Sequence, residues 1–488
     1  MSLTRRQFVT GGIGATAASV LACRGGDASP IEGEYDLLVI GSSFAGLPIA
    51  LRAAQRGLRT LVVEAGGFPG RWFAGEPAML PFTSSGAVDY PANAARMIAV
   101  GGASNHWEGA VNRMRPSDFR LRSEFGLDVD WPLSYDELEP YYCRAERDLS
   151  VRGSAAVVDA EPARSCAYPR APDAGYRPPN VEIDGRRLRY FPLARSVRGD
   201  GPVRLVDREV EAFASSSAGT LASGHQTTRL VTLDGRRIDH ALVRSADGSE
   251  RQVFAKRIVL AAGVLESARL LLLSRSRWFP NGLGNARDLV GRYFTVHPTL
   301  RWQFTPPSLG RLFDGAPQAL SNRTYDYADE FRRRGLNAAH FQLRVFRDES
   351  IILKHQPEIE ARGANRVTLS TAETDRFGDP VADLALGWSP RDLATKWAGE
   401  DVLAATVEAL GGHPDTVDKS EKWRFHPSGT LRMGFDANTG VVDRNLKVFG
   451  VENLFVSGAC VFPTAGTANP TETIVALAHR LADHLLRG

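Results

Sequence analysis

Short apolar runs separated by glycine-containing turns dominate the beginning of the chain. Residues 37–40 (LLVI) form a continuous apolar run of the kind that a buried parallel strand shows. After a turn, the apolar positions within residues 47–54 recur at helical spacing, and residues 60–63 form a second apolar run. This order predicts a strand, a helix and a strand, as in an α/β fold.

The turn after the first strand has the pattern of a dinucleotide-binding loop. Gly41, Ser43 and Gly46 occupy its three glycine positions, and Glu64 ends the second strand close to the expected spacing of about 20 residues. Gly41 permits the tight turn, and the helix amino-terminus can then point free N–H groups at a diphosphate. An acid at position 64 can accept hydrogen bonds from ribose hydroxyls, which disfavours NADP. Ser43 replaces the middle glycine, and an ordinary strand-turn-helix is the alternative interpretation.

A second segment narrows the choice of dinucleotide. Residues 258–261 again predict a buried strand, Gly263 allows close backbone contact, and a leucine-rich helix follows. Before it, residues 229–233 and 241–244 flank Asp234-Gly235, which predicts a hairpin. A β-meander inserted into a dinucleotide fold is typical of flavoproteins, whereas domains that bind NAD continue with alternating strands and helices.

Two runs near the carboxyl end contain candidate chemistry. His426 begins HPSGTLRMG, and Asn469 lies in GTANPTETIVAL at residues 466–477. The two residues frame a glycine-rich strand-turn-helix. This arrangement suits a proton acceptor and a hydrogen-bonding partner that face one cofactor.

Size and charge exclude some classes of protein. At 488 residues the chain exceeds the usual size of a single core, so we expect two domains. The apolar content of 43% and charged content of 24% are those of an ordinary globular protein. The net charge of +3, from 59 basic and 56 acidic residues, is too balanced to indicate a nucleic-acid partner.

The first residues predict export. Arg5 and Arg6 precede an apolar run over residues 9–22, which is shorter than the roughly 20 residues that span a bilayer. Paired arginines before a short apolar core indicate a twin-arginine signal, which carries folded proteins. The run ends at Cys23 in a sequence that resembles a lipobox, so we expect a periplasmic or cell-surface protein that contacts the membrane only through a lipid on Cys23. A chance cysteine beside a cleavage site is the alternative.

The other cysteines give no pattern of their own. If Cys23 carries a lipid, Cys143, Cys166 and Cys460 remain, which is an odd number. No cysteine or histidine spacing indicates a metal site. We therefore expect no disulfide framework and no metal, with Cys460 packed inside the last segment.

Taken together, these motifs resemble the glucose–methanol–choline (GMC) oxidoreductases over residues 35–486. The resemblance rests on pieces in family order: GSSFAG, GGASNHW (101–107), WPLSYDELEPYY (131–142), VLAAGVLESARLLLLS (259–274), DLVGRYFTVHP (288–298), HPSGTLRMG and GTANPTETIVAL. It implies FAD as the cofactor and oxidation of an alcohol as the reaction. It also implies an α/β fold with a Rossmann-type FAD-binding domain and a discontinuous, sheet-containing substrate domain.

The resemblance also implies the order of the domains. After the signal, lipobox and tether at residues 1–33, the FAD-binding domain takes residues 34–130, 206–298 and 424–488. The substrate domain takes residues 131–205 and 299–423. A strand at residues 365–370 should belong to it, although its pocket-lining residues cannot be ranked.

By resemblance, His426 is the catalytic base and Asn469 holds the substrate oxygen, because an amide cannot act as a base. His106, in GGASNHW, resembles the histidine that bonds covalently to the flavin in pyranose oxidases, and a noncovalent contact is the alternative. His297, His355 and His413 belong to no constellation of this kind, and we interpret His297, which closes the VGRYFTVHP strand, as structural. The residues expected to bind FAD are Gly41, Ser42, Ser43, Gly46, Glu64, Gly101, Gly102, Asn105, His106, Ala262, Gly263, Gly458, Ala459, Asn469, Pro470 and Thr471.

The resemblance favours bacterial sugar-oxidising members related to pyranose oxidases, with a sugar or glycoside as substrate. A nonredox lyase, an oxidase of a non-sugar alcohol and a noncatalytic sugar-binding lipoprotein are the alternatives. Because a lipid-anchored protein lies beside an energised membrane, we expect a quinone or cytochrome as acceptor, and hence a dehydrogenase.

Overall fold

The computed structural model describes residues 31, 33–68, 81–153, 162–171, 208–307, 327–346 and 350–487, together with short strands between residues 182 and 194 and at 322–324. The export signal and lipid attachment site expected within residues 1–30 lie outside the described residues. Within the described part of the chain, none of the helices is both long enough and apolar enough to cross a membrane.

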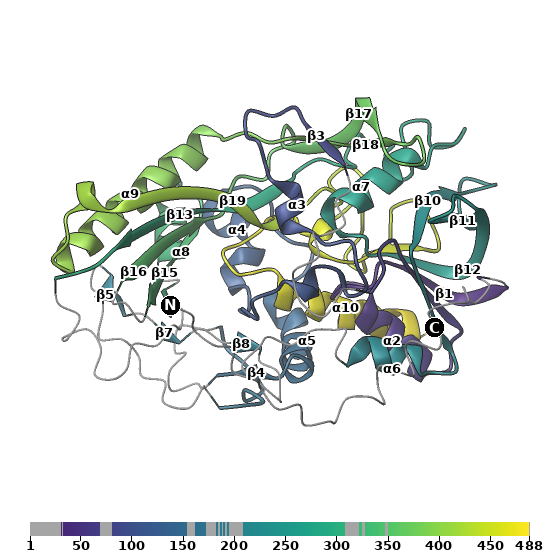
Figure 1. Cartoon of the computed structure of the whole chain (residues 1–488), viewed down its shortest axis with the longest axis horizontal. Coiled ribbons are helices and arrows are strands. Elements are labelled where there is room, and N and C mark those ends of the chain that lie inside the picture. Colours follow the sequence, from purple (N-terminus) through teal and green to yellow (C-terminus); the bar gives the residue numbers. More distant parts are fainter. Residues whose placement is uncertain are drawn as a thin grey trace, which may run out of the picture.

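One half of the molecule is built on a seven-stranded sheet (Figure 1). Its order is β10-β11-β12-β1-β2-β9, and β20 also pairs with β12. The strands are β1 (Glu34–Ile40), β2 (Thr60–Glu64), β9 (Gly219–Ser223), β10 (His225–Val231), β11 (His240–Ser245), β12 (Glu250–Leu260) and β20 (Leu454–Val456). β12, β1, β2, β9 and β20 are parallel, whereas β10, β11 and β12 form an antiparallel meander. The predicted hairpin is confirmed.

Helices cover this sheet because its central strands are apolar on both faces. Leu38, Val39 and Val62 are completely buried. The covering helices are α2 (Leu47–Gln55), α6 (Glu209–Ala214), α7 (Gly263–Leu273) and α10 (Thr471–Leu486). In Figure 1, α2, α6 and α10 lie on one side of the sheet and α7 lies on the other. The expected α/β fold with a Rossmann-type domain is confirmed.

The other half is built on a six-stranded antiparallel sheet of order β19-β13-β16-β15-β14-β7. Its strands are β7 (Arg189–Tyr190), β13 (Thr295–Phe304), β14 (Asn322–Thr324), β15 (Ala339–Val345), β16 (Ile351–Pro357) and β19 (Asp418–Ser428). Helices α8 (Tyr327–Arg333) and α9 (Pro390–Ala409) contact this sheet, and α9 lies along β13 and β19 in Figure 1. Ser389 begins α9 with a capping box, because its hydroxyl accepts the N–H of Asp392.

A separate apolar core fills the space between this sheet and its helices. Leu300, Trp302, Phe341 and Leu353 pack there with Leu403 of α9. His355 stacks on Phe341 with ring centres 4.9 Å apart, and burial lowers the pKa of His355 to about 3. His355 is therefore a neutral ring in an apolar core.

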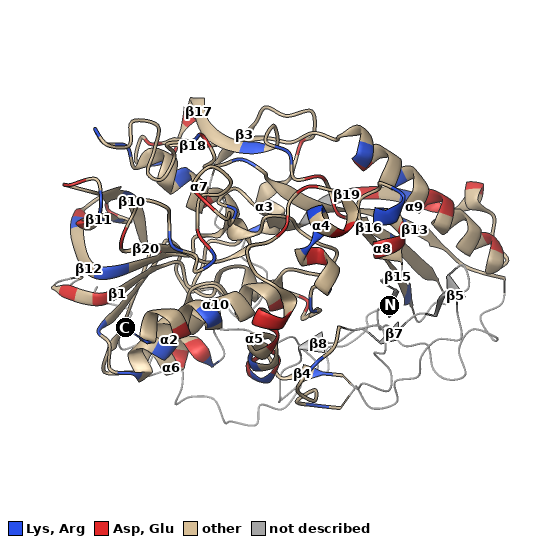
Figure 2. Ribbon diagram, turned by 180° about the vertical axis from the view of Figure 1, so that it is seen from behind, with Lys and Arg blue, Asp and Glu red and all other residues tan. Residues whose placement is uncertain are grey.

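Smaller elements connect the two sheets. β3 (Phe82–Ser84), β18 (Pro380–Ala385) and β17 (Arg366–Thr374) form a three-stranded sheet with β18 in the middle. Two short pairs are β4 (Val151–Arg152) with β8 (Leu193–Ala194) and β5 (Glu182–Ile183) with β6 (Arg186–Arg187). The helices are α3 (Ala92–Ala95), α4 (Leu121–Phe125) and α5 (Tyr135–Asp148). The strand expected at 365–370 is thus found as β17. Basic and acidic positions are interspersed over the described ribbon (Figure 2). The five domain boundaries remain predictions.

The expectation of no disulfide is wrong. Cys143 of α5 is bonded to Cys166. The counting argument failed because Cys460, buried in the core, is the cysteine left over among the described residues, and it stays a free thiol. The prediction that Cys460 packs in the last segment is correct.

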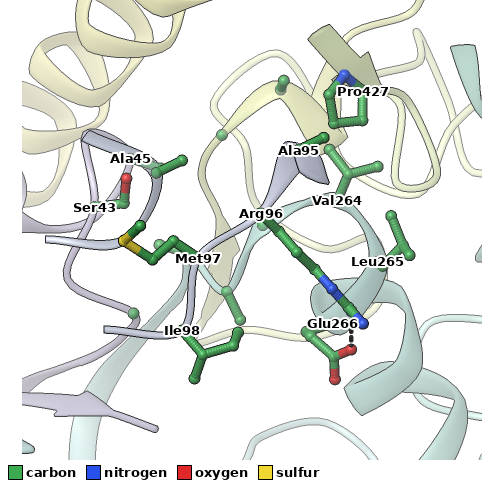
Figure 3. A pocket seen from close by; sticks show the side chains of 18 of the residues that line it. Ser43, Ala45, Ala95, Arg96, Met97, Ile98, Val264, Leu265, Glu266 and Pro427 are labelled. Atoms are coloured by element: carbon green, nitrogen blue, oxygen red, sulfur yellow. Dashed lines mark hydrogen bonds and ion pairs between the residues drawn. The ribbon is translucent and has the colours of Figure 1, made fainter. Parts of the chain in front are cut away.

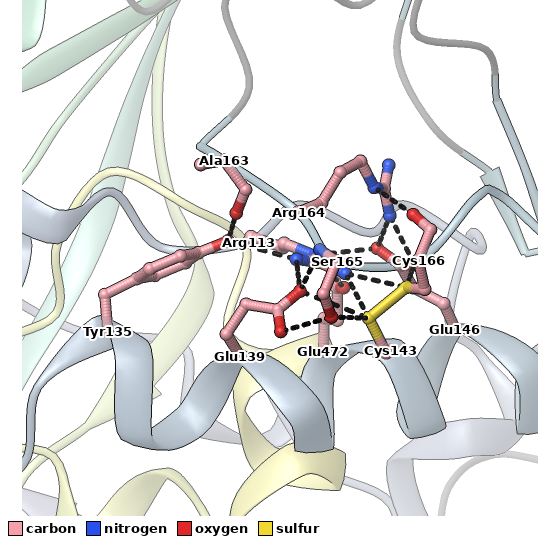
Figure 4. The surroundings of a disulfide bond; sticks show 10 residues. All are labelled: Arg113, Tyr135, Glu139, Cys143, Glu146, Ala163, Arg164, Ser165, Cys166 and Glu472. Atoms are coloured by element: carbon pink, nitrogen blue, oxygen red, sulfur yellow. Dashed lines mark hydrogen bonds and ion pairs between the residues drawn. A yellow bond between two sulfur atoms is a disulfide. The ribbon is translucent and has the colours of Figure 1, made fainter.

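The disulfide covers a buried cation (Figure 4). Arg113 Nη2 donates toward both sulfurs, at 3.3 Å from Cys143 Sγ and 3.4 Å from Cys166 Sγ. Burial alone would lower the pKa of Arg113, but Glu146, 2.9 Å away, and Glu472 raise it above its usual range. Since Glu472 belongs to the first turn of α10, the disulfide, α5 and α10 form one braced unit.

Removing the disulfide should destabilise this unit. The bond closes a loop of 23 residues, for which the chain-entropy model gives about 3 kcal/mol. We expect the double variant Cys143→Ser/Cys166→Ser to unfold at a lower temperature than the wild type in a thermal melt. Dithiothreitol should lower the melting temperature of the wild type and leave that of the double variant unchanged. Equal melting temperatures for both proteins without reductant would contradict the brace.

Candidate active site

A cavity of about 430 Å³ lies between the two sheets, and both halves of the molecule contribute to its wall. Most of the residues predicted to bind a dinucleotide or to act in catalysis line this cavity. They are Gly41, Ser42, Ser43, Glu64, Gly102, His106, Ala262, Gly263, His426, Gly458, Ala459, Asn469, Pro470 and Thr471.

The first glycine turn is held by Ser42. Its hydroxyl donates to Glu64 at 2.7 Å and accepts the N–H of Gly101 at 2.9 Å, so it joins the end of β2 to the loop before residues 102–105. Gly41 has a φ of +102°, and a Cβ there would lie 2.4 Å from the carbonyl oxygen of Ala261. The position therefore needs glycine for both its conformation and its close contact.

Ser43, which departs from the fingerprint, packs against the second glycine pair. A Cβ on Gly102 would lie 2.8 Å from the Cβ of Ser43, and Gly102 has a φ of +50°. The loop at residues 101–105 thus approaches the first turn closely because residue 102 has no side chain. The serine at position 43 is accommodated by the glycine at position 102.

Three predicted residues are not among those that line the cavity. Gly46 lies behind the turn, where a Cβ would be 2.3 Å from the carbonyl oxygen of Gly41. Gly101 donates its N–H to Ser42, and the Asn105 amide donates to the carbonyls of Val100 and Gly102 at 2.9 Å each. These three residues support the lining rather than form it.

Several features of the wall fit a bound dinucleotide. Helices α2, α7 and α10 begin at the cavity, and none of them has a side-chain hydrogen bond at its amino-terminal cap. Their first N–H groups and dipoles favour a negatively charged group such as a diphosphate. The indole N–H of Trp107, which also lines the cavity, is buried and has no hydrogen-bond partner among the described residues. A bound ligand can supply that acceptor.

Charged side chains around the glycine turns have partners within the protein. Arg96 extends along the wall to Glu266, with 2.8 Å between Nη1 and the carboxylate (Figure 3). Burial raises the pKa of Glu64, and the hydrogen bonds from Gly66 and Ser42 oppose this change. Glu64 is thus held at the end of β2, where it lines the cavity as the predicted ribose-binding acid would.

At the other end of the cavity, His426 lies in a chain of hydrogen bonds that defines its tautomer. His297 Nε2 is 2.7 Å from the carbonyl oxygen of Gly466, which can only accept, so Nε2 carries the proton. In neutral His297, Nδ1 is then an acceptor, and His426 Nδ1, 2.8 Å away, is its donor. This leaves the lone pair of His426 on Nε2, where the Asn469 amide donates to it at 3.0 Å.

The interpretation of His297 as structural did not foresee its contact with His426. It lies at the start of β13 and is 1% exposed, and its ring meets that of His426 edge to face. The sequence gave no reason to pair two histidines 129 positions apart. The Gly466 carbonyl, His297 and His426 form one line of hydrogen bonds that only the folded chain brings together.

The carbonyl that begins this line is itself fixed. The N–H of Gly466 donates to Glu358 at 2.7 Å, and Glu358 also contacts Arg332, which is completely shielded from solvent. Burial raises the pKa of Glu358 to about 7, although Arg332 acts in the opposite direction. A Cβ on Gly466 would lie 3.1 Å from the carboxyl carbon of Asp118. The loop before Asn469 is therefore held by a buried charged cluster.

His426 has a strained backbone. Its φ is +63°, in the left-handed region that residues other than glycine seldom adopt. Gly429 follows with a φ of +79°, and a Cβ there would lie 1.9 Å from the carbonyl oxygen of Tyr293. Strain of this kind persists where the surrounding structure holds it, and it is common at functional sites.

His106 also lines the cavity, directly after the 3₁₀ turn at Gly102–Asn105. Burial lowers the pKa of His106, so its imidazole is neutral near pH 7. A neutral ring retains a lone pair that can act as a nucleophile. The geometry therefore leaves both alternatives for His106, covalent and noncovalent, open.

Among the lining residues that sequence analysis missed are Gln342, Lys354 and Gln356, which lie on β15 and β16. The signal was the alternation of polar and apolar residues in HFQL and LKHQ, which places all three on one face of a sheet. β17, which we expected to supply pocket residues, contributes none of the described lining.

The contact between Gly102 and Ser43 gives a test of the loop. We expect Gly102→Ala to lower stability by about 1–3 kcal/mol, because the new methyl group meets Ser43. Gly126→Ala is a matched control, since Gly126 has a φ of +71° but nothing within 4 Å of its Cβ. Adding Ser43→Gly to Gly102→Ala should restore part of the loss in a thermal melt. No recovery in the double variant would contradict the close contact.

Comparisons with known proteins agree with this geometry. Residues 36–278 match a family model described as an FAD binding domain, and residues 361–478 match one described as GMC oxidoreductase. The chain is 27% identical to 2-methyl-1,2-propanediol dehydrogenase of Mycolicibacterium austroafricanum, over 93% of this chain and 95% of that protein. It is 26% identical to the fructose dehydrogenase large subunit of Gluconobacter japonicus, over 79% and 80% of the two chains.

Among solved structures, formate oxidase of Aspergillus oryzae has the same fold, with a TM-score of 0.67 and 15% identity over 93% of this chain and 98% of that one. The two family matches lie on both sides of the cavity, and the second includes His426 and Asn469. The chain therefore belongs to the glucose–methanol–choline (GMC) family of oxidoreductases, which bind FAD and act on CH–OH groups.

Proposed function

We propose that this enzyme oxidises an alcohol group of a sugar or glycoside, with His426 as the base and Asn469 as the residue that orients the substrate oxygen. The observation that carries the proposal is the tautomer of His426, whose Nε2 lone pair lies 3.0 Å from the Asn469 amide in the cavity wall. The name of the fructose dehydrogenase relative supports a sugar as substrate.

Bound FAD supplies the oxidant, because it can accept a hydride from the carbon that bears the hydroxyl. The residues that would hold it are the two glycine turns, Glu64 and the amino-termini of α2, α7 and α10. The remaining task is the hydroxyl proton, since a free alkoxide is too unstable to form without a base. That task falls to the protein.

His426 Nε2 is suited to take this proton. Its lone pair faces the cavity because Nδ1 is engaged by His297. When Nε2 accepts the proton, the ring becomes a cation, and its Nδ1–H then donates to His297 as a charge-assisted hydrogen bond. His297 thus acts through His426, as a positioning residue that fixes the tautomer and steadies the charged ring.

Asn469 supplies orientation. Its amide donates to the same nitrogen that takes the proton, so a substrate hydroxyl that binds at His426 also lies within reach of that amide. Asn469 directly precedes Pro470 and the start of α10, which is braced through Glu472 and Arg113. Its side chain is therefore carried by a rigid part of the fold.

We further propose that the enzyme works outside the cytoplasm, attached by a lipid at Cys23, and passes electrons to a quinone or cytochrome. The Cys143–Cys166 bond supports export, because disulfides persist mainly in oxidising compartments. Turnover with a quinone analogue should exceed turnover with oxygen alone, and faster turnover with oxygen would contradict a dehydrogenase.

Replacing the base should separate binding from chemistry. We expect His426→Ala to bind FAD and to slow reduction of the flavin by the sugar about 10²–10⁴-fold, the usual contribution of a general base. Asn469→Ala should slow reduction less, because the base remains. Rapid mixing at saturating substrate, followed by flavin bleaching, measures both effects.

His413→Ala is the control for the base, since the side chain of His413 is 70% exposed on the surface. If His426→Ala reduced its flavin as fast as the wild type, the base would lie elsewhere. If no alcohol bleached the flavin of the wild type, the redox function would be wrong and a lyase would be the better assignment.

We propose that His106 bonds covalently to the flavin. Its position in the cavity wall and its neutral ring support this attachment. After acid precipitation, the wild type should retain FAD in the pellet, whereas His106→Ala should release it. His225→Ala is the matched control, because His225 also lines the cavity and should not affect retention. Release of FAD from the wild type would show a noncovalent contact.

A further inference from the structure

The six-stranded sheet has one polar face and one apolar face. Strand pairing aligns Arg301 with Lys354 and Lys354 with Gln342, and it aligns His340 with Gln356 in the next polar row. Because side chains alternate along a strand, these residues share a face. The intervening rows, which contain Leu300, Trp302 and Phe341, form the opposite face.

The apolar face fixes which way the sheet is turned. Its residues pack in the core that α9 closes through Leu403, so a shift of register by one residue would expose that core. The polar face must therefore point away from α8 and α9. It lies toward the cavity, because Gln342, Lys354 and Gln356 line it.

Much of the polar face is buried, although its groups are hydrophilic. Gln342 and Gln356 are each 4% exposed, and Thr299 is 3% exposed. A hydrogen-bond series orders the amides: Gln356 donates to Thr299 at 2.8 Å, and Gln342 donates to Gln356 and, at 3.1 Å, to His340. Burying polar groups is costly unless they are hydrogen-bonded, so a cavity wall of this kind suits a polar occupant.

The polar face and His426 are parts of one sheet. His426 lies near the end of β19, which pairs with β13, and β13 pairs in turn with β16. His297 links the two parts, since it belongs to β13 and contacts His426. A substrate hydroxyl at His426 would therefore place the rest of a small molecule against a surface whose position relative to the base is fixed by strand pairing.

We propose that Gln342, Gln356 and Lys354 are the specificity-determining residues of this enzyme, and that they bind the hydroxyls of the substrate that are not oxidised. This inference rests on the proposed function. The substrate class that fits is a polyhydroxylated ring or chain, because this face presents amide oxygens that can accept from hydroxyls beside amide and ammonium N–H groups that can donate to them. Lys354 adds N–H donors and no acceptor. A mono-alcohol of the same size has one hydroxyl and therefore offers fewer hydrogen bonds to this face than a polyol does.

The test compares two classes of alcohol. The first is a panel of hexoses, methyl glycosides and pentitols, and the second is cyclohexanol, which has a six-membered ring and one hydroxyl. We expect Gln342→Met and Gln356→Met to lower kcat/KM for the best polyol of the panel by roughly tenfold each, the size of one lost hydrogen bond. The same variants should leave kcat/KM for cyclohexanol unchanged or raise it.

Gln303→Met is the matched control. Gln303 belongs to the same strand face as Thr299 and Arg301 but is not among the residues that line the cavity. Its replacement should leave the ratio of polyol to cyclohexanol activity unchanged. Equal losses for both alcohols in Gln342→Met and Gln356→Met would mean that the amides only support the sheet, and would overturn the proposal.

A binding measurement keeps this inference separate from the proposed chemistry. In the FAD-loaded His426→Ala protein, which should turn over slowly, calorimetry measures the affinity for each polyol directly. Adding Gln342→Met should weaken the binding of the best polyol roughly tenfold. Failure of every polyol to bind would overturn the specificity assignment, whereas binding without flavin reduction in the wild type would overturn the redox function alone.

Discussion

A backbone carbonyl can only accept a hydrogen bond, and the carbonyl of Gly466 thereby sets the tautomers of His297 and His426. It makes His297 a donor through Nε2, which makes His426 a donor through Nδ1 and leaves its lone pair in the cavity wall. Which atom donates at each step of the series therefore follows from the Gly466 carbonyl, which has no hydrogen to donate. The buried cluster of Glu358, Arg332 and Asp118 then acts as an anchor for the loop that presents this carbonyl.

The two sheets meet at this series from opposite sides. The parallel sheet contributes helix amino-termini and glycine turns that suit a dinucleotide, and the antiparallel sheet contributes histidines and amides. Neither half contains a complete site. Asn469 joins them, because it precedes α10, which packs on the parallel sheet, while its amide contacts a histidine of β19. The disulfide and Arg113 stabilise the first turn of α10, next to Asn469.

Local patterns in the sequence predicted the dinucleotide half well. The strands around Gly41 and Glu64 and the helix after Gly263 are determined by short apolar runs and glycine, which act over a few residues. The same reasoning could not find His297, since its partner lies far along the chain and only strand pairing brings the two together. It also missed the Cys143–Cys166 bond, because a count of cysteines does not tell which one is buried. The alternation of polar and apolar residues in β13, β15 and β16 is visible in the sequence, but which face meets the cavity depends on where α9 packs.

The left-handed backbone at His426 has a consequence for how the site can change over evolutionary time. A non-glycine residue in that region costs about 1–3 kcal/mol, a large part of the margin by which most proteins stay folded. Glycine is the residue that would relax position 426, and it is also a residue that cannot hold a proton. On the proposed role of His426 as the base, stability and function are opposed at this position, because the residue that relaxes the backbone also removes the base.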